Sequence, residues 1–244
     1  MTVSSAPFLG GKIKLNQAES GYRAGIDAAL LASAVLVGAN KIAVEFGCGA
    51  GAALLSAARL NPNTRFIGLE YDADVAQLAA GNVLENGLSE RVDIVNTDAL
   101  MWKSDRPVDA VFFNPPFFDD RSALRAPKPE KSKAWINHDG LARWVDSGLK
   151  RLKEGGVLTM IHRADYLERI LSAIGNRGGD THVLSVHPRI DQPAKRIIVA
   201  TRKVSKSPLV ILPPLILHPQ SGSSYTERAD ALLRGEAKLA LLEV

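Results

Sequence analysis

The residues best suited to chemistry are the four of the tetrapeptide 114–117 (NPPF), which follow an apolar run directly. Two consecutive prolines restrict the backbone, so the Asn114 side-chain oxygen and the Pro115 carbonyl form a fixed pair of hydrogen-bond acceptors. Such a pair can accept both hydrogens of a planar NH₂ group, and Phe117 can stack on the ring that carries it. The tetrapeptide therefore predicts a site for an exocyclic amine or a carboxamide.

An amine of this kind is a poor nucleophile because its lone pair is delocalised. Hydrogen bonds to two acceptors bend the nitrogen toward a tetrahedral shape and stabilise the positive charge that develops on it, without an ionised base. The remaining requirement is an alkyl donor held in line with the nitrogen. We therefore predict that the catalytic residues are Asn114, Pro115, Pro116 and Phe117. The plainer alternative is a proline turn that only ends a strand.

The segment 45–51 (EFGCGAG) has the composition of a ligand-binding turn, where a predicted strand passes into a predicted helix. Glycines there permit a tight turn and let a ligand approach the N–H groups at the start of the helix. Glu70 ends the next predicted strand, 70 − 51 = 19 residues further on, at a spacing where a carboxylate accepts ribose hydroxyls. Asp98 and Ala99 follow the third strand in the same way.

The glycine turn and two acids at successive strand ends favour a nucleoside site. The candidate contacts from these motifs are Glu45, Gly47, Cys48, Gly49, Gly51, Glu70, Asp98, Ala99 and Asn114. The turn also satisfies the dinucleotide pattern, because Ala52 can stand at its third position. A nicotinamide-dependent dehydrogenase therefore stays open, although the sequence offers no partner for hydride transfer at the crevice.

These groups need a framework that brings successive strand ends together. Strands are predicted at 41–46, 65–70, 91–96, 108–113, 157–161, 182–187 and 196–201. Helices are predicted at 28–37 (capped by Asp27), 52–60, 74–86, 141–152 (stopped by the glycines at 155 and 156), 164–174 and 226–242. The alternation predicts an α/β fold with a mostly parallel sheet and helices on both faces. The short connection 188–194 predicts an antiparallel hairpin at the edge.

The composition limits the class of protein. The 244 residues are 46% hydrophobic and 23% charged, which excludes collagen, coiled coil and membrane bundle as the main description. A net charge of +4 gives a mild preference for anionic partners. One cysteine, no signal-peptide pattern and no membrane-length apolar run predict a cytoplasmic protein, and the histidine spacing predicts no metal site. We expect a single domain over 1–244, with an N-terminal extension (1–40), a core (41–203) and a C-terminal cap (204–244).

The order of the motifs resembles class I S-adenosylmethionine-dependent methyltransferases, specifically the amino-methylating group with an Asn-Pro-Pro-aromatic motif. The resemblance covers roughly residues 41–203. It implies a Rossmann-like fold with a seven-stranded sheet whose last strand is antiparallel. It also implies that S-adenosyl-L-methionine is the cofactor, with its methionine part on the glycine turn, its ribose on Glu70 and its adenine on Asp98.

A narrower likeness involves residues 25–27 and 30–31 before the first core strand and residues 225–226 in the tail. These are similar to the bacterial enzymes that methylate N6 of an adenine beside the anticodon of a valine tRNA. In that group the N-terminal segment closes over the cofactor, which adds the candidate contacts Tyr22, Arg23 and Asp27. Phe117 stands where that group commonly has tyrosine, and glutamine and guanine methyltransferases share the wider motif.

The segment 119–133 (DDRSALRAPKPEKSK) is the candidate substrate-binding surface. It carries three acids and five cations, which are Arg121, Arg125, Lys128, Lys131 and Lys133. A basic loop at the mouth of the site can contact RNA phosphates, while a loop that is only solvated is the alternative. The cations that can extend this patch, or protect an edge hairpin, are Lys195, Arg196, Arg202, Lys203 and Lys206.

These observations give one leading hypothesis, an S-adenosylmethionine-dependent N-methyltransferase that acts on adenine N6 in tRNA, with tRNA or another RNA as partner. A protein-glutamine or guanine N2 methyltransferase would use the same tetrapeptide. Outside enzymes, the alternative is a non-catalytic RNA-binding module on the same scaffold.

Overall fold

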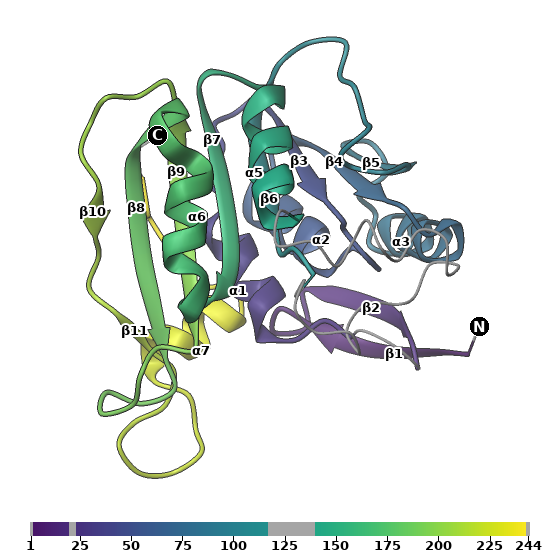
Figure 1. The fold of residues 1–244 in the computed structure, drawn as a ribbon. Coiled ribbons are helices and arrows are strands. Elements are labelled where there is room, and N and C mark those ends of the chain that lie inside the picture. The colour runs from purple at the N-terminus through teal and green to yellow at the C-terminus, as the bar shows by residue number, and fades with distance from the viewer. Residues whose placement is uncertain (1, 20–22, 117–139, 243–244) are drawn as a thin grey trace.

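The computed structural model describes residues 2–19, 23–116 and 140–242. Figure 1 shows a twisted sheet with helices on its faces and a small separate hairpin at the N-terminus. Several predicted site residues lie outside the described residues. They are Tyr22, Phe117 and the five cations of the segment 119–133.

Within the described residues, one nine-stranded sheet forms the centre of the fold. Its strands are β3 (Ile42–Phe46), β4 (Arg65–Glu70), β5 (Val92–Asn96), β6 (Val108–Phe113), β7 (Leu152–Arg163), β8 (Gly178–His187), β9 (Arg196–Lys203), β10 (Val210–Ile211) and β11 (Leu215–Ile216). The strand order is β10-β8-β9-β7-β6-β3-β4-β5, and β11 also pairs with β8. Strand β9 is antiparallel to β7 and β8, and the other pairs are parallel. The predicted sheet class and edge hairpin are therefore confirmed, and β10 and β11 add two short strands to the seven expected.

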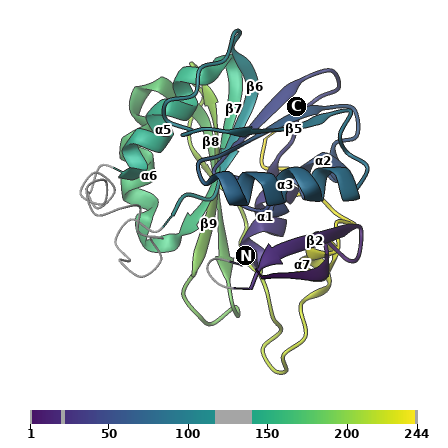
Figure 2. The ribbon, with the colours of Figure 1, turned by 90° about the vertical axis from the view of Figure 1, so that its right-hand side faces the viewer.

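Helices cover both faces of this sheet. They are α1 (Ile26–Ala34), α2 (Ala52–Leu60), α3 (Ala73–Glu85), α5 (Gly140–Arg151), α6 (Leu167–Ile174) and α7 (Glu227–Leu233), with short 3-10 turns η1 (Ala164–Tyr166) and η2 (Gly175–Arg177). One buried cluster joins α1, α2, α3 and α7 to the sheet, and a second joins α5 and α6 to the opposite face. Figure 2 shows the two layers on either side of the sheet.

Helices α1, α5 and α7 differ from the prediction at a cap or at an end. Helix α1 begins at Ile26 after Gly25 and ends at Ala34, and Asp27 does not cap it because its carboxylate binds Arg196 instead. Helix α5 ends at Arg151 and β7 begins at once, so the two glycines lie in that strand. Helix α7 ends at Leu233 because Gly235 has a positive φ of 64°, and the chain then returns so that Leu239 donates to the Ser33 carbonyl.

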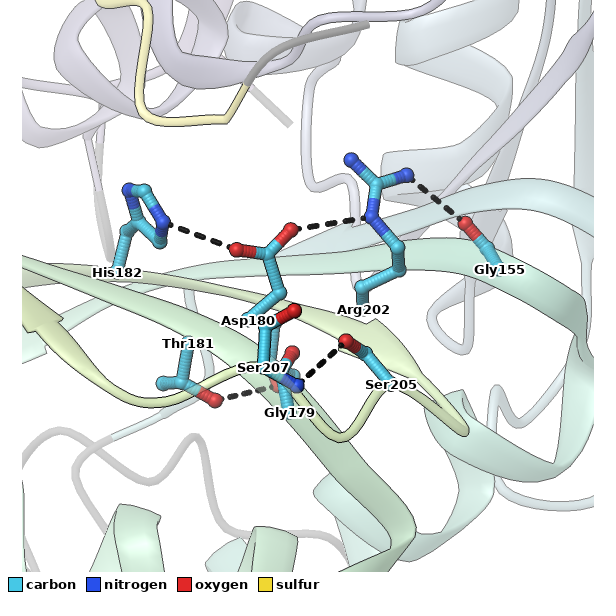
Figure 3. A network of polar contacts seen from close by, with 9 residues as sticks. Gly155, Gly179, Asp180, Thr181, His182, Arg202, Ser205 and Ser207 are labelled. Carbon is cyan, nitrogen blue, oxygen red and sulfur yellow. Dashed lines mark hydrogen bonds and ion pairs between the residues drawn. The ribbon is translucent and has the colours of Figure 1, made fainter.

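Strand β8 begins four residues earlier than predicted, at the open end of the β8–β9 hairpin. The pairing shifts register between Gly179 and His182, and Asp180 there has a φ of 51°. Figure 3 shows the Asp180 carboxylate bound to His182 and to Arg202 Nε, both at 3.2 Å, while Arg202 also donates to the Gly155 carbonyl at 3.1 Å. This polar network therefore holds the irregular end of the strand in place.

The N-terminal segment forms an antiparallel hairpin that the sequence did not predict. Its strands are β1 (Val3–Phe8) and β2 (Ile13–Ala18). Ile13 and Leu15 of β2 are fully buried in the core cluster that also contains side chains of α1 and α2. The hairpin is therefore part of the hydrophobic core and covers the end of α3.

Asn82 of α3 and Asn86, the C-cap of that helix, complete the free edge of β2. Asn82 accepts from the Asn16 N–H at 3.0 Å and donates to the Asn16 carbonyl at 2.8 Å. Asn86 makes the same two bonds to Lys14, at 2.9 and 2.8 Å. Each side-chain amide thus replaces a neighbouring strand. Asn82, which is fully buried, also donates to the Ala50 carbonyl at 2.9 Å. It therefore links the hairpin, α3 and the turn before α2.

We expect Asn82→Ala to lower the free energy of unfolding by about 3 kcal/mol, because it leaves three partly buried backbone groups without their partner. Asn96→Ala is the matched control, since Asn96 donates to two backbone carbonyls on an exposed surface. Its expected loss is below about 1 kcal/mol. Urea unfolding of both variants measures the difference, and equal losses would contradict the linking role of Asn82.

Candidate active site

The turn between β3 and α2 has a backbone that favours glycine at three positions. Gly47, Gly49 and Gly51 have φ values of 64°, 55° and 91°. A Cβ on Gly47 would lie 2.9 Å from the Trp144 ring, whereas a Cβ on Gly49 would meet none of the described atoms within 4 Å. The turn is thus packed tightly against Trp144 at Gly47 and is open at Gly49. A ligand can approach the backbone on that open side.

Glu70, at the carboxyl end of β4, holds this turn in place. Its Oε2 accepts the Gly49 N–H and its Oε1 accepts the Asp72 N–H, both at 2.9 Å. Asp72 in turn caps α3 through the N–H groups of Asp74 and Val75. A carboxylate has about four acceptor positions, so Glu70 retains capacity for the hydroxyls of a ribose. The geometry therefore fits a nucleoside held against the turn.

The Glu45 side chain, and the side chain of Cys48 within the turn, are buried beneath the backbone of the turn. Burial raises the pKa of Glu45 well above its ordinary value, and Glu70 raises it further, while the Leu54 N–H acts in the opposite direction. Its Oε2 accepts no hydrogen bond from the described residues. Burial also raises the pKa of the Cys48 thiol, with further contributions from the two glutamates. The Cys48 side chain is 6% exposed and points toward Gly68. It is therefore not an activated nucleophile.

Asp98 and Ala99 follow β5 at the same edge of the sheet. The Asp98 carboxylate accepts the Leu100 N–H at 2.8 Å, and its carbonyl accepts the N–H groups of Met101 and Trp102. These bonds fold the chain into a tight turn, in which Asp98 is half-buried and Ala99 is buried. The structure therefore places Asp98 at the strand end next to that of Glu70.

The register of the parallel strands brings Asn114 beside the glycine turn. Phe46 pairs with Phe113, and these are the residues that precede Gly47 and Asn114. Both phenylalanine rings pack on Trp144, at centroid distances of 6.2 and 5.5 Å. Asn114 is half-buried and Pro115 is buried. The sheet thus brings together the turn and the first residues of the tetrapeptide, which the sequence separates by more than sixty positions.

The N-terminal candidates have other partners in the structure. Arg23 is exposed and donates to the Ser4 hydroxyl at 2.8 Å. Asp27 is half-buried and binds Arg196 Nε at 2.8 Å, which ties the start of α1 to the start of β9. Their contact with a cofactor stays a prediction.

Sequence reasoning found no role for His162, which the structure places at the site. His162 lies at the end of β7 beside the strand that carries Asn114, and it is fully buried. Its ring lies 4.3 Å from that of Tyr166. Burial and then Arg163 lower the pKa of His162 to about 4, so it is neutral at physiological pH. Its position after a predicted strand was the available signal.

Five further cations were predicted to extend the basic segment 119–133, and the structure places them at two opposite edges of the sheet. Lys195 precedes β9 and Arg196 is its first residue; both lie at the edge that carries Asn114, because Arg196 pairs with Arg163 at the end of β7. The others lie at the opposite edge, where Arg202 binds Asp180 and Lys203 donates to the Leu152 carbonyl at 2.5 Å. Arg202, Lys203 and Lys206 therefore do not extend a patch beside Asn114.

The fold and the site together define a class I S-adenosyl-L-methionine-dependent methyltransferase. A sequence model of the methyltransferase small domain matches residues 20–174, and the chain belongs to this family. The glycine turn, with its open side at Gly49 and Glu70 behind it, fits the cofactor of the family. The predicted fold class and cofactor are confirmed.

The chain is similar to two enzymes named tRNA1(Val) (adenine(37)-N6)-methyltransferase. That of Bacteroides thetaiotaomicron is 30% identical over 154 residues, which cover 62% of this chain and 64% of that protein, less than two thirds of its length. That of Phocaeicola vulgatus is 29% identical over 185 residues, covering 73% of this chain and 76% of that protein.

Solved structures show the same fold. A predicted O-methyltransferase from Agrobacterium tumefaciens superposes with a TM-score of 0.73 at 25% identity, over 87% of this chain and 98% of that chain. The T. thermophilus 16S rRNA N2 G1207 methyltransferase, solved with AdoMet and guanosine, gives 0.58 at 16% identity, over 83% and 50%. The second likeness is one of fold alone.

Two further searches concern only the residues that the structure describes. None of their helices is long and apolar enough to cross a membrane. Their His, Cys, Asp and Glu side chains form no group of three that can hold a metal ion.

The buried Glu45 predicts a pH dependence of stability. The folded state binds the Glu45 proton more tightly than the unfolded state, whose pKa is near the ordinary 4.5. This contribution is present at low pH and is lost as the pH rises above that value. We expect the stability of Glu45→Gln relative to the wild type to increase as the pH rises above about 5, because only the wild type loses this contribution, and urea unfolding at several pH values measures the difference.

Glu85→Gln is the control, because the pKa of Glu85 is shifted in the opposite direction from that of Glu45. Lys14 and Asn16 lower the pKa of the exposed Glu85, so its contribution is present above the unfolded pKa and is lost as the pH falls. A Glu45→Gln variant whose stability changes with pH as the wild type does would contradict the assigned burial effect.

Proposed function

We propose that the protein is an N-methyltransferase that modifies adenine N6 in tRNA, with S-adenosyl-L-methionine as methyl donor. The observation that carries this proposal is the pairing of Phe46 with Phe113, which sets Asn114 beside the glycine turn at one edge of the sheet. The likeness to two tRNA adenine-N6 methyltransferases supports the choice of substrate. A cytoplasmic location is part of the same proposal.

Asn114 and Pro115 orient the amine in this proposal. The Asn114 side-chain oxygen and the Pro115 carbonyl accept the two N–H groups, which localises the nitrogen lone pair. The cofactor supplies an electrophilic methyl group when it is bound. The same two oxygens stabilise the charge that develops on the nitrogen, and one proton then passes to water. His162, being neutral, adds no opposing charge near this position.

Each remaining candidate has one role in the proposal. The turn and the buried Glu45 beneath it shape the seat for the methionine part of the cofactor. Glu70 accepts the ribose hydroxyls, which its free lone pairs allow, and Asp98 binds the adenine. Tyr22, Arg23 and Asp27 cover the cofactor, Phe117 stacks on the substrate base, and the cations of the segment 119–133 contact RNA phosphates.

The first experiment identifies the product. Total tRNA is incubated with the enzyme and cofactor labelled in its methyl group, and the digested nucleosides are analysed by mass spectrometry. We expect the label in N6-methyladenosine. Label in N2-methylguanosine, or in glutamine of an added translation factor, would replace adenine as the substrate. Tight binding of RNA without any affinity for S-adenosylhomocysteine would indicate a non-catalytic module.

A pair of variants separates catalysis from cofactor binding. Asn114→Ala should lower kcat about 100-fold or more, because one acceptor for the developing charge is lost. Its affinity for S-adenosylhomocysteine, measured by calorimetry, should stay within about threefold, since one weak contact at most is lost. Glu70→Ala should show the reverse pattern, with cofactor affinity reduced at least about tenfold. A large loss of affinity in Asn114→Ala would contradict the assigned role.

A further inference from the structure

Two loops extend together from the edge of the sheet that carries Asn114. The first, residues 188–195, joins β8 to β9, and the second, residues 217–226, follows β11. Strand β11 is parallel to β8, and Arg196 at the start of β9 pairs with Arg163 at the end of β7, so both loops leave the sheet at this edge. Figure 1 shows them projecting beyond the sheet, below β11 and α7. They are called the paired loops below.

Hydrogen bonds make the paired loops one body. The N–H groups of Leu217 and His218 donate to the carbonyls of His187 and Pro188, at 2.8 and 2.9 Å. The Arg189 guanidinium donates to the Pro219 carbonyl and, at 2.6 Å, to the Gly222 carbonyl. A planar guanidinium that binds two carbonyls fixes their relative position. The projection is therefore a preorganised surface, which lowers the entropic cost of binding a partner.

The paired loops present a pair of stacked rings and an exposed lysine, and the first loop also carries the exposed acid Asp191. The rings of His218 and Tyr225 stack at 4.9 Å with an interplanar angle of 21°, and Tyr225 is 38% exposed. His218 is further fixed by a bond to the Ser224 carbonyl at 2.9 Å. The exposed Lys195 lies at the base of the first loop. Exposed rings that stack on bases, next to cations that contact phosphates, are typical of surfaces that bind unpaired RNA.

The paired loops lie close enough to the active site for one RNA molecule to contact both. Strand β9 stands two strands from β6 in the sheet, which is about 10 Å at the usual strand spacing. Ile190 is the exposed large apolar side chain among the described residues of the first loop, and one such residue does not make an apolar protein interface. An unpaired base at Asn114 would leave neighbouring nucleotides within reach of the paired loops.

We infer that the paired loops dock the RNA substrate beside the active site, with an unpaired base on the Tyr225 ring and a phosphate at Lys195. This inference rests on the proposed function and names a second contact surface for its RNA. The surface contributes to RNA affinity and leaves the chemical step to Asn114.

The decisive experiment compares two charge reversals on either side of β9. Lys195→Glu changes the paired loops, and Lys206→Glu makes the same change of charge on an exposed residue at the other edge of the sheet. We expect Lys195→Glu to weaken RNA binding about fivefold or more in a filter-binding assay with unmodified tRNA, and to reduce the salt dependence by about one phosphate contact. Lys206→Glu should bind as the wild type does.

Variants of Tyr225 test the stacking contact. Tyr225→Ala should raise the KM for tRNA about fivefold or more, whereas Tyr225→Phe keeps the ring and should stay near the wild type. Both should keep kcat at saturating tRNA and the affinity for S-adenosylhomocysteine. A loss in Tyr225→Ala that appears in kcat and in thermal stability, with KM unchanged, would show a structural role and overturn the stacking contact.

The outcomes separate this inference from the proposed function. If the wild type methylates tRNA and Lys195→Glu binds tRNA as Lys206→Glu does, the docking surface is wrong and the proposed function stands. If the wild type transfers label to a protein and Lys195→Glu weakens that reaction alone, the partner of the paired loops is a protein and both proposals are overturned. RNA binding that falls only in Lys195→Glu, with N6-methyladenosine as product, supports both.

Discussion

The contact between the Glu70 carboxylate and the Gly49 N–H is the interaction on which the site depends. It fixes the open side of the glycine turn against β4, and the other carboxylate oxygen holds Asp72, which caps α3. Helix α3 then supports the N-terminal hairpin and the turn through Asn82. Glu70 therefore joins the turn to the start of α3, and Asn82 joins that helix to the hairpin.

Burial of a second carboxyl group, that of Glu45, is electrostatically unfavourable at this site. Glu45 lies buried under the same turn, and its pKa is raised mainly by burial and further by the nearby Glu70. Burial favours the neutral form of Glu45, and Glu70 accepts hydrogen bonds from two backbone N–H groups. The arrangement places a hydrogen-bond acceptor at the edge of the sheet and, beneath it, a buried group that favours its neutral form.

The core elements were predictable because their signals are local. The strand Arg65–Glu70 and the helix Ala52–Leu60 have the predicted bounds, since apolar runs, glycine turns and caps lie within a few residues. The edge that gathers Glu70, Asp98 and Asn114 follows from parallel strands alone. The position of these three residues at one edge could therefore be predicted without knowledge of any side-chain contact.

Features that depend on distant partners could not be predicted in this way. The β1–β2 hairpin is completed by Asn82 and Asn86, which lie more than sixty residues away. Asp27 has the pattern of a helix cap, yet Arg196 at a separation of 169 residues takes its carboxylate. The paired loops are joined by Arg189 through backbone carbonyls, and such bonds leave no mark on the types of the residues that accept them.

A crystal structure with S-adenosylhomocysteine and adenosine tests the central claim most directly. The account predicts the cofactor ribose hydroxyls on the Glu70 carboxylate, and the adenosine N6 within hydrogen-bond distance of both the Asn114 side-chain oxygen and the Pro115 carbonyl. An Asn114 amide turned into the protein interior, or an adenine bound away from the glycine turn, would contradict it.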